Sequence, residues 1–433
     1  MARAKKEAAL TPEERLQAAL VPDWEWPYKL PENWCWLKLV ESFDNHTDSK
    51  KKIKQKDYLV KGKLAVVDQG QELIGGYTND VEKSYSGALP IVIFGDHTRC
   101  IKFVDFPFAQ GADGVKALRP KPFYLPKAFY YALQSVNIPN LGYRRHFPLF
   151  NKFSIPLPPF TEQQRIVDRI ESLFTKLDEA KEKAQAVVDS FETRKAAILH
   201  KAFTGELTAK WREEHGVGME SWEVRTLDSV CSSIFDGDHM PPPKAELGIP
   251  FLVISNVNTG HLTFENTRFV PQEYYDTLSD TRKPQLGDVL YTLVGSFGIP
   301  VVVNSKRPFC FQRHMALLRP IDVSPQFLWY ILQTPEMYDK ASSIATGTAQ
   351  LTVPIKGLRA MTIPRPKIAE QVEIVRILDG FFAREQSAKE AAEAVLDQID
   401  LMKKSILARA FRGELGTNDP SEESAVELLK QIF

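Results

Sequence analysis

Short polar clusters recur along the chain, and their residue types could do chemistry. Gly-Asp-His occurs twice, at residues 95–97 and 237–239. An aspartate beside a histidine suits acid–base catalysis or metal binding. Because no further ligands follow at coordinating spacing, a turn with a hydrogen-bonded histidine is the simpler interpretation. The alternative interpretation is that these residues present polar groups to a binding partner.

A second kind of cluster suits the reading of DNA bases. Gln312, Arg313 and His314 are consecutive, and Thr348 and Gln350 follow a glycine in a similar loop-like stretch. Arginine matches the major-groove edge of guanine, and glutamine matches that of adenine. Exposed loops are often polar without a binding role, so each cluster alone is a weak indication.

Basic residues gather in the first third of the chain. Seven lysines lie in the stretch from Lys50 to Lys63. A second basic cluster consists of Arg144, Arg145 and His146. A lysine run is most often a solvated face. The alternative is a strip that contacts phosphate groups.

The sequence lacks the motifs of nucleotide-dependent enzymes. It has neither GxxxxGK[ST] nor a GxGxxG after a strand. Leu-Pro-Pro-Phe at 157–160 lacks the Asn or Asp that amino-methyltransferases place before Pro-Pro-aromatic, so a structural lead-in is the better interpretation. The single Glu-x-Lys, at Glu179, falls in a predicted helix, a poor place for a nuclease carboxylate. The residues therefore favour binding over catalysis.

Length and composition bound the class of protein. A chain of 433 residues, 43% hydrophobic, predicts two to four packed domains. Its formal net charge is zero, but residues 1–154 carry +6 and residues 217–362 carry −2. The overall balance therefore does not exclude a nucleic-acid partner.

The sequence gives no sign of secretion or membrane insertion. Residues 1–22 have no apolar core of signal-peptide length, and the most apolar stretch, 289–303, is interrupted by glycines and a proline. Cys35, Cys100, Cys231 and Cys310 show no CxxC spacing, which predicts reduced thiols in the cytoplasm.

An internal repeat organises the elements that must position these clusters. Residues 155–207 and 363–415 align without a gap at an offset of 208, with 23 identities over 53 positions. Such self-similarity indicates a duplication. Each copy has an extended, proline-containing lead-in and a long helix, which we expect to end near Gly205 and Gly413. Thr161 with Gln164 resembles a capping box at the first helix start.

Apolar residues recur at spacings of three and four along both copies, as in a coiled coil. We expect one helix over residues 162–202, about 60 Å long, with the other copy as its packing partner. Arg194 and Glu385 are flaws in the apolar stripe. Two unrelated amphipathic helices on separate cores are the alternative. The residues expected to pack are Ile170, Leu173, Leu177, Ala184, Phe191, Leu378, Phe381, Ala392, Val395 and Ile399.

The segments that precede the two helices, 1–154 and 217–362, have the short β-rich runs and Gly/Pro turns of globular domains. Each contains a run ending Leu-Arg-Pro, at 118–120 and 318–320, followed by an aromatic helix-like run. The two globules are therefore interpreted as diverged copies.

The repeated motifs resemble those of the specificity subunits of type I restriction–modification systems, over nearly the whole chain. The lead-ins P-x-P-x-x-x-E-Q-x-x-I-V at 156–167 and 364–375 carry the resemblance, as do the helix ends Ala-Phe-x-Gly-Glu-Leu at 202–207 and 410–415. Parts of the globules are similar to target-recognition domains of some family members: residues 92–99, 108–114, 236–239, 254–256, 287–291, 311–314 and 347–350.

The resemblance implies an α+β fold with two globular α/β target-recognition domains, separated by two long antiparallel coiled-coil helices and related by a pseudo-two-fold axis. We expect recognition domains over 1–154 and 217–362, and conserved spacer helices over 155–216 and 363–433. Short helical stretches at 11–20 and 421–433 are expected to pack near each other and complete this symmetry.

The implied function is to read a split site in double-stranded DNA, one half per domain. Two methylase subunits would dock on the helices, and motor–nuclease subunits would join them. The chain itself would be non-catalytic and hold no cofactor or metal, since S-adenosylmethionine, ATP and Mg would sit on the partners. A protein-binding scaffold, or an enzyme with its own nuclease or methyltransferase site, is the alternative.

The candidates for DNA contact come from the clusters and motifs above. They are Lys51, Lys52, Lys54, Lys56, His97, Arg99, Tyr143, Arg144, Arg145, His239, Ser255, Asn256, Gln312, Arg313, His314, Thr348 and Gln350.

Overall fold

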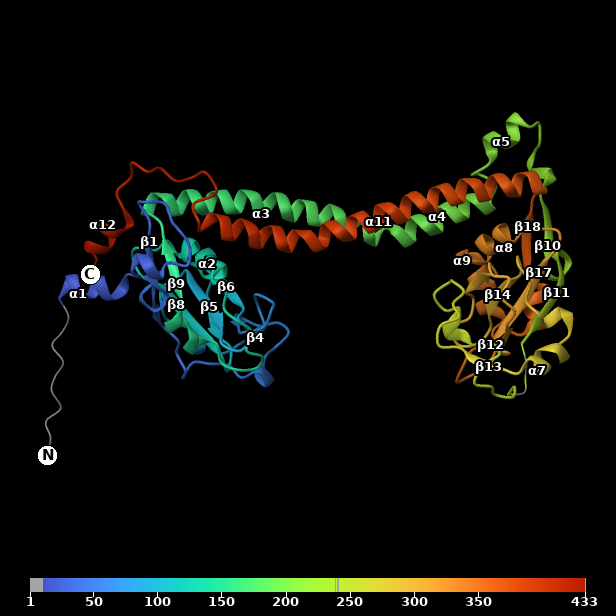
Figure 1. The fold of residues 1–433 in the computed structure, drawn as a ribbon, viewed down its shortest axis with the longest axis horizontal. Helices are drawn as coiled ribbons and strands as arrows, with labels where there is room; N and C mark the ends of the chain where they lie inside the picture. The colour runs from blue at the N-terminus through green and yellow to red at the C-terminus, as the bar shows by residue number, and fades with distance from the viewer. Residues whose placement is uncertain (1–10, 238, 240, 433) are drawn as a thin grey trace. The chain divides into compact units, whose positions relative to one another are not determined.

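The computed structural model describes residues 11–237, 239 and 241–432. The chain divides into two compact units. The first unit holds Met1–Ala184 with Ala394–Phe433, and the second holds Gln185–Glu393. Each unit combines one globule of short strands with parts of long helices (Figure 1). The class is α+β, as expected.

The first globule contains three sheets among its described residues. The four-stranded sheet is antiparallel, in the order β2-β8-β5-β6. In the second sheet, ordered β4-β3-β7, β3 pairs with β7 in parallel, and β1 pairs with β9 in the third. The strands are β1 (Cys35–Lys38), β2 (Phe43–Asn45), β3 (Leu64–Val67), β4 (Gly76–Thr78), β5 (Ile91–Gly95), β6 (Ile101–Val104), β7 (Phe108–Gln110), β8 (Val115–Pro120) and β9 (Ser154–Leu157).

The four-stranded sheet of the first globule is covered on both faces. Ile91 and Ile93 of β5 pack towards the three-stranded sheet, with Phe108. Val92 and Phe94 join the core that includes α2 (Pro126–Ser135). Because successive strand residues face opposite sides, this double covering requires an unbroken apolar strand rather than an alternating one.

The second globule repeats this topology. Its sheets have the orders β11-β17-β14-β15, β13-β12-β16 and β10-β18, and β12 pairs with β16 in parallel. Helix α8 (Pro325–Leu332) follows the Leu-Arg-Pro strand, as α2 does in the first globule. The shared topology confirms that the globules are diverged copies. The strands are β10 (Glu223–Thr226), β11 (Cys231–Asp236), β12 (Ile249–Leu252), β13 (Arg268–Val270), β14 (Val289–Thr292), β15 (Pro300–Val302), β16 (Cys310–Phe311), β17 (Met315–Pro320) and β18 (Thr362–Arg365).

The repeated lead-ins are β9 and β18, and a long helix follows each. The expectation of one helix over 162–202 is wrong, because α3 (Phe160–Asp189) and α4 (Phe191–Phe203) are separated at Ser190. The Ser190 hydroxyl donates to the carbonyl of Ala186, and the Arg194 guanidinium donates to the Ser190 Oγ and the Val187 carbonyl. These side-chain bonds accompany the break in the helix.

The second long helix, α11 (Ile368–Ala410), is continuous. The helices stop before Gly205 and Gly413, whose φ angles of +86° and +74° favour glycine, as the sequence predicts. The capping box at Thr161 is not formed as predicted, because α3 already begins at Phe160.

Within each unit the long helices run antiparallel and pack along the predicted stripe. In the first unit Lys403 of α11 pairs with Asp178 of α3. In the second, Lys389 lies over the ring of Phe191. The other predicted packing residues are buried or half-buried, but Val395 is 41% exposed. The stripe passes through the half-buried Leu396 there, so the assignment of Val395 is wrong by one position.

The two ends of the described chain meet in the first unit. Helix α1 (Pro12–Ala19) is capped reciprocally by Thr11 and Glu14. Ala19 shares a core with Ala425 and Leu429 of α12 (Ala425–Lys430), and the two helices lie close together in Figure 1. This confirms the predicted contact between the terminal stretches, of which residue 433 lies outside the described residues.

The remaining helices are short: α5 (Ala209–Glu214), α6 (Leu227–Val230), α7 (Gln272–Thr277), α9 (Pro335–Ile344) and α10 (Ile355–Ala360). Across the described part of the chain, no helix combines the length and apolar character needed to cross a bilayer.

Candidate nucleic-acid interface

Polar candidates from several parts of the chain lie together at one end of the strands of the four-stranded sheet in each unit. In the first unit, the end of β5 at Gly95 lies opposite the start of β8 at Val115. In the second, the end of β14 at Thr292 lies opposite the start of β17 at Met315, next to the end of β11. The connections that leave these strand ends define what we call the loop edge of each unit.

A long loop from elsewhere in the chain completes each loop edge. In the first unit residues 139–146 precede the short helix η5 (Phe147–Lys152) and β9, and the His146 N–H donates to the carbonyl of Asp96 at 2.8 Å. In the second unit residues 345–354 precede α10 and β18, and the Val353 N–H donates to the Leu293 carbonyl at 2.9 Å. The Tyr143–Arg145 stretch and the Thr348–Gln350 stretch therefore occupy corresponding loops.

The loop edge of the first unit presents an aromatic pair and two arginines. The His97 ring stacks on Tyr143 with 5.0 Å between centroids, and Tyr143 is 86% exposed. Arg144 is exposed, and the Arg145 Nε donates to the Asp96 carboxylate at 2.8 Å. These side chains are available to a ligand.

The lysine run does not form one continuous strip. The Lys51 ammonium donates to the Ser84 carbonyl at 3.3 Å, on the side of the three-stranded sheet. Burial lowers the pKa of Lys52, and the positive charges of Lys116 and Arg145 lower it further. Lys52 is half-buried, and the groups that perturb its pKa include Asp96 and Arg145 of the loop edge. Lys54 and Lys56 are exposed beside and within the short helix η3 (Gln55–Asp57).

Two members of the first-unit clusters have other roles. Arg99 lies in the connection from β5 to β6, but its Nη1 donates to the Ile138 carbonyl at 3.0 Å and the residue lines a hollow of about 630 Å³ with Gln134 and Lys404. The sequence predicts His146 to be part of the second basic cluster, but its side chain is fully buried and hydrogen-bonded, so this prediction is wrong.

The loop edge of the second unit contains a hollow of about 480 Å³ in which four sequence-predicted residues meet. Its polar lining includes Asp236, His239, Arg313, His314 and Gln350. The His239 Nε2 lies 2.7 Å from the Asp236 carboxylate. Arg313 is exposed, and no acidic group among the described residues pairs with it. Burial, followed by the charge of Arg313, lowers the pKa of His314.

The other second-unit candidates differ in exposure. Thr348 is exposed in the same loop as Gln350. Ser255 is exposed on η7 (Ile254–Asn256), and Gln312 is half-buried. Asn256 is only 2% exposed; its Oδ1 accepts from the Val253 N–H, and its amide nitrogen donates to the Glu265 carbonyl. Its assignment as a DNA contact is therefore wrong, because both ends of the amide brace the loop.

Neither Gly-Asp-His tripeptide builds a metal site from the residues that the structure describes, since no group of three or more potential ligands gathers there. The tripeptides also occupy different places. Gly95 is the last residue of β5, whereas Gly237 follows the end of β11. Asp238 lies outside the described residues. Asp96 is fully buried and acts within the protein.

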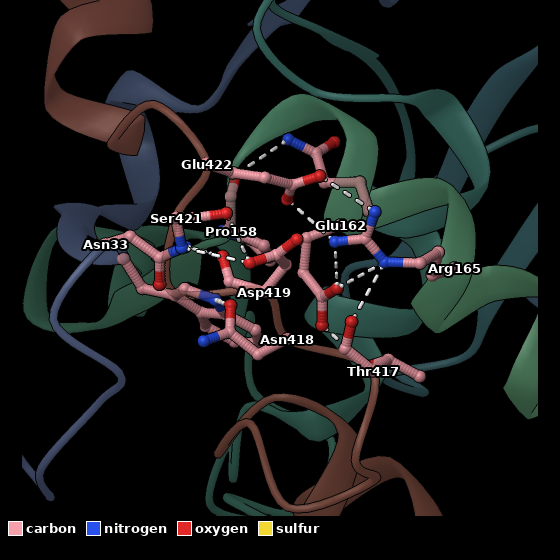
Figure 2. A network of polar contacts seen from close by, with 11 residues as sticks. Asn33, Pro158, Glu162, Arg165, Thr417, Asn418, Asp419, Ser421 and Glu422 are labelled. Atoms are coloured by element: carbon pink, nitrogen blue, oxygen red, sulfur yellow. Dashed lines mark hydrogen bonds and ion pairs between the residues drawn. The ribbon is translucent and has the colours of Figure 1, made fainter.

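The repeated Glu-Gln of the lead-in motif has a role that sequence reasoning missed. Glu162 is buried and accepts a hydrogen bond of 2.6 Å from the Thr417 hydroxyl. It also forms an ion pair with Arg165, and Arg165 in turn forms a bidentate ion pair with Glu422 (Figure 2). The segment that follows α11 is thereby fastened to the start of α3.

The second copy uses the same device with different partners. The buried Glu370 accepts from Thr208 and Arg212, both at 2.7 Å, and from the Trp222 indole at 2.8 Å. The adjacent glutamines fasten each helix to its globule, since Gln163 accepts from the Leu125 N–H and Gln371 from the Ser324 N–H. Identity between the two copies was the available signal for these roles.

A family model of the type I restriction modification DNA specificity domain matches the chain twice, over residues 31–188 and 219–396. The chain is 27% identical over 305 residues to the type I restriction enzyme EcoKI specificity subunit of Escherichia coli K12, covering 65% of this chain and 64% of that protein. It is also 27% identical over 301 residues to the EcoBI specificity subunit of Escherichia coli, covering 64% and 63%. The alignments thus span less than two thirds of these relatives.

Solved structures share the fold. The HsdS subunit from Thermoanaerobacter tengcongensis matches with a TM-score of 0.59 and 20% identity, over 90% of this chain and all of that one. A chain from a structural study of assembly and conformational transition in the type I R-M system matches with a TM-score of 0.62 and 21% identity, at the same coverage. With two matched copies across most of its length, the chain belongs to the family of type I restriction modification DNA specificity domains.

Proposed function

We propose that this chain is the non-catalytic specificity subunit of a type I restriction–modification complex and reads a bipartite duplex site, one half per unit. One observation carries this proposal: the two loop edges are built on the same topology but display different side chains. The first presents Tyr143 and Arg145, and the second presents Arg313 and Gln350. Equivalent scaffolds with different polar groups suit two different base sequences.

The distribution of charge supports a division between contacts to the DNA phosphates and recognition of the bases. The first globule, with its net charge of +6, offers lysines such as Lys52 and Lys54 to phosphate groups. The second globule, at −2, depends on local groups such as Arg313 and on the charge of its partners.

The long helices suit the docking of two copies of one partner, since their repeats offer two similar surfaces. In this proposal residues 1–154 and 217–362 are the recognition domains, and residues 155–216 and 363–433 form the spacer that sets the distance between half-sites. Two methylase subunits dock on the spacer, and motor–nuclease subunits join the complex. S-adenosylmethionine, ATP and Mg are bound by these partners.

The decisive experiment exchanges one recognition domain. Residues 217–362 are replaced by the corresponding segment of another family member, and the chain is co-expressed with the methylase subunits of its system. Modified adenines are then mapped across the host genome. We expect one half of the recognised site to change and the other half to stay the same.

A change in both halves, or in neither, would contradict the modular assignment. Binding to duplex DNA must also weaken steeply as salt rises, because each phosphate contact releases counterions. A salt-insensitive interaction with a protein, without retention of DNA, would instead identify the chain as a scaffold.

A further inference from the structure

A buried histidine closes the loop that carries Tyr143 and Arg145. The His146 Nε2 lies 3.1 Å from the Leu141 nitrogen, and its Nδ1 lies 2.9 Å from the Asp96 carbonyl oxygen. The Leu141 N–H can only donate, so Nε2 accepts and the ring proton sits on Nδ1. His146 therefore joins both ends of the loop to the turn after β5.

The carboxylate of Asp96 holds the next residues of the same loop. Its Oδ1 accepts from the Phe147 N–H at 2.7 Å, and its Oδ2 accepts from the Arg145 Nε at 2.8 Å. Asp96 is fully buried, whereas the Arg145 side chain is 62% exposed. The carboxylate thus fixes the inner end of the guanidinium, and among the described residues no acceptor binds the outward Nη groups.

Other groups around Arg145 match a polyanionic ligand. The charge of Lys52 interacts with those of Asp96 and Arg145, the charge of Lys116 interacts with Asp96, and His97 stacks on Tyr143 of the same loop. Burial alone would raise the pKa of Asp96, but the Phe147 N–H, Arg145 and Lys116 hold it below its ordinary value. Asp96 therefore stays ionised, with the Arg145 Nε in contact with its Oδ2.

The second unit holds its corresponding loop by another device. Thr352 forms main-chain bridges with Val294 and Thr346, and the Gly295 N–H donates to the Leu351 carbonyl at 3.0 Å. No ionised side chain is needed in these bonds. The Asp96 arrangement is thus specific to the first unit.

We propose that Asp96 is a positioning residue for DNA recognition by the first unit: it aims Arg145 at the duplex, while His146 holds the loop in its binding shape before DNA arrives. This inference rests on the proposed function. A preformed loop avoids the entropy cost of ordering on binding, and a fixed guanidinium can bind a guanine edge or a phosphate in one geometry.

The test uses the full chain with its methylase subunits and duplexes of randomised sequence, from which bound molecules are selected and sequenced. The variants are Asp96→Asn, Arg145→Ala, the double variant, and Asp105→Asn as a control. Asp105 is an exposed aspartate between β6 and β7 of the same globule. Asparagine can still accept from Phe147 but no longer pairs with Arg145.

Asp96→Asn should reduce base preference in one half of the site by about fivefold or more and leave the other half unchanged. In the Arg145→Ala background it should add no further loss, because Asp96 acts through Arg145. The control should select the wild-type site. Arg145→Lys, at an exposed position that does not threaten folding, should lose the same preference, since lysine lacks the planar fork.

Several results would overturn the inference. They are unchanged preference in Asp96→Asn, full additivity in the double variant, or unchanged preference in Arg145→Lys. If the wild-type complex selects no sequence, the proposed function falls and this inference with it. If it selects a bipartite site that these variants read normally, only the positioning role of Asp96 is refuted.

Discussion

Arg194 and Glu385, the two charged residues that interrupt the apolar stripes of the long helices, pair with each other at 2.7 Å in the second unit. At the offset of 208 residues, their counterparts in the first unit are Met402 and Leu177. The second unit therefore has an ion pair at the positions where the first unit has two apolar side chains. Each flaw in the sequence pattern is compensated by the other.

Replacing this pair with its counterparts should test the compensation. Glu385→Leu alone should destabilise the second unit by about 1 kcal/mol, because it leaves Arg194 half-buried without its carboxylate. The double variant Arg194→Met/Glu385→Leu should recover most of that loss. Urea unfolding of the four chains of the double-mutant cycle measures the coupling.

The reciprocal exchange is the matched control. Leu177→Glu should destabilise the first unit, and adding Met402→Arg should restore part of the loss. If the effects of either pair were simply additive, the two residues would not compensate each other.

The two buried glutamates of the lead-in motif should differ in their tolerance of glutamine. Burial raises the pKa of Glu162, so folding disfavours its charged form relative to the unfolded chain, and in the glutamine variant Arg165 keeps Glu422 as a partner. Glu162→Gln should cost less than about 1 kcal/mol at neutral pH. Glu370→Gln should cost about 3–5 kcal/mol, because it leaves Arg212 buried without its carboxylate.

Thermal unfolding of the two variants measures this contrast, and its pH dependence has a defined sign. A carboxyl with a raised pKa binds its proton more readily in the folded state, so wild type should gain stability relative to Glu162→Gln as the pH falls towards 4.5. Equal costs for the two glutamine variants at neutral pH would contradict the assignment.

Arg313 and Lys54 should affect DNA binding in different ways. Arg313→Ala is expected to relax base preference at one position of one half-site, at a cost of roughly 1–3 kcal/mol. Lys54→Ala should weaken all sequences alike and reduce the salt slope by about one. Binding titrations on the selected duplex and on single-base variants distinguish the two effects.

Arg313→Lys is the matched control, since it keeps the charge but loses the planar fork. It should retain part of the affinity and lose the base preference. Uniform effects of Arg313→Ala and Lys54→Ala across all sequences would exclude Arg313 from base reading.

His314 should make the stability of the second unit depend on pH. Its pKa in the folded chain lies below the ordinary value of 6.5, because burial and then Arg313 disfavour the charged ring. As the pH falls through 6.5, the unfolded chain takes up the proton and the folded chain resists, so stability falls. His314→Asn should flatten this step in thermal unfolding between pH 7.5 and about pH 5, and an unchanged profile would contradict it.

Local pattern predicted the elements well, because periodicity depends on residues that are near each other in the chain. The repeated stripe indicated the long helices, and Gly205 and Gly413 marked their ends correctly. The break at Ser190 escaped prediction, since it involves a guanidinium that reaches back along the helix. Val395 was misassigned because spacings of three and four alternate, and an error of one position exchanges a packed residue for an exposed one.

The sequence by itself determined the duplication, the two β-rich globules, and the residue types that could meet DNA. The tertiary structure decided which of them share a surface. Asp96 and Arg145 are far apart in sequence and meet only because β5 ends beside the loop before η5. Asn256 and His146 match the polar pattern, yet they are buried and fully used within the protein. Residue type indicates what a side chain can bind, whereas folding determines whether the protein or a partner occupies it.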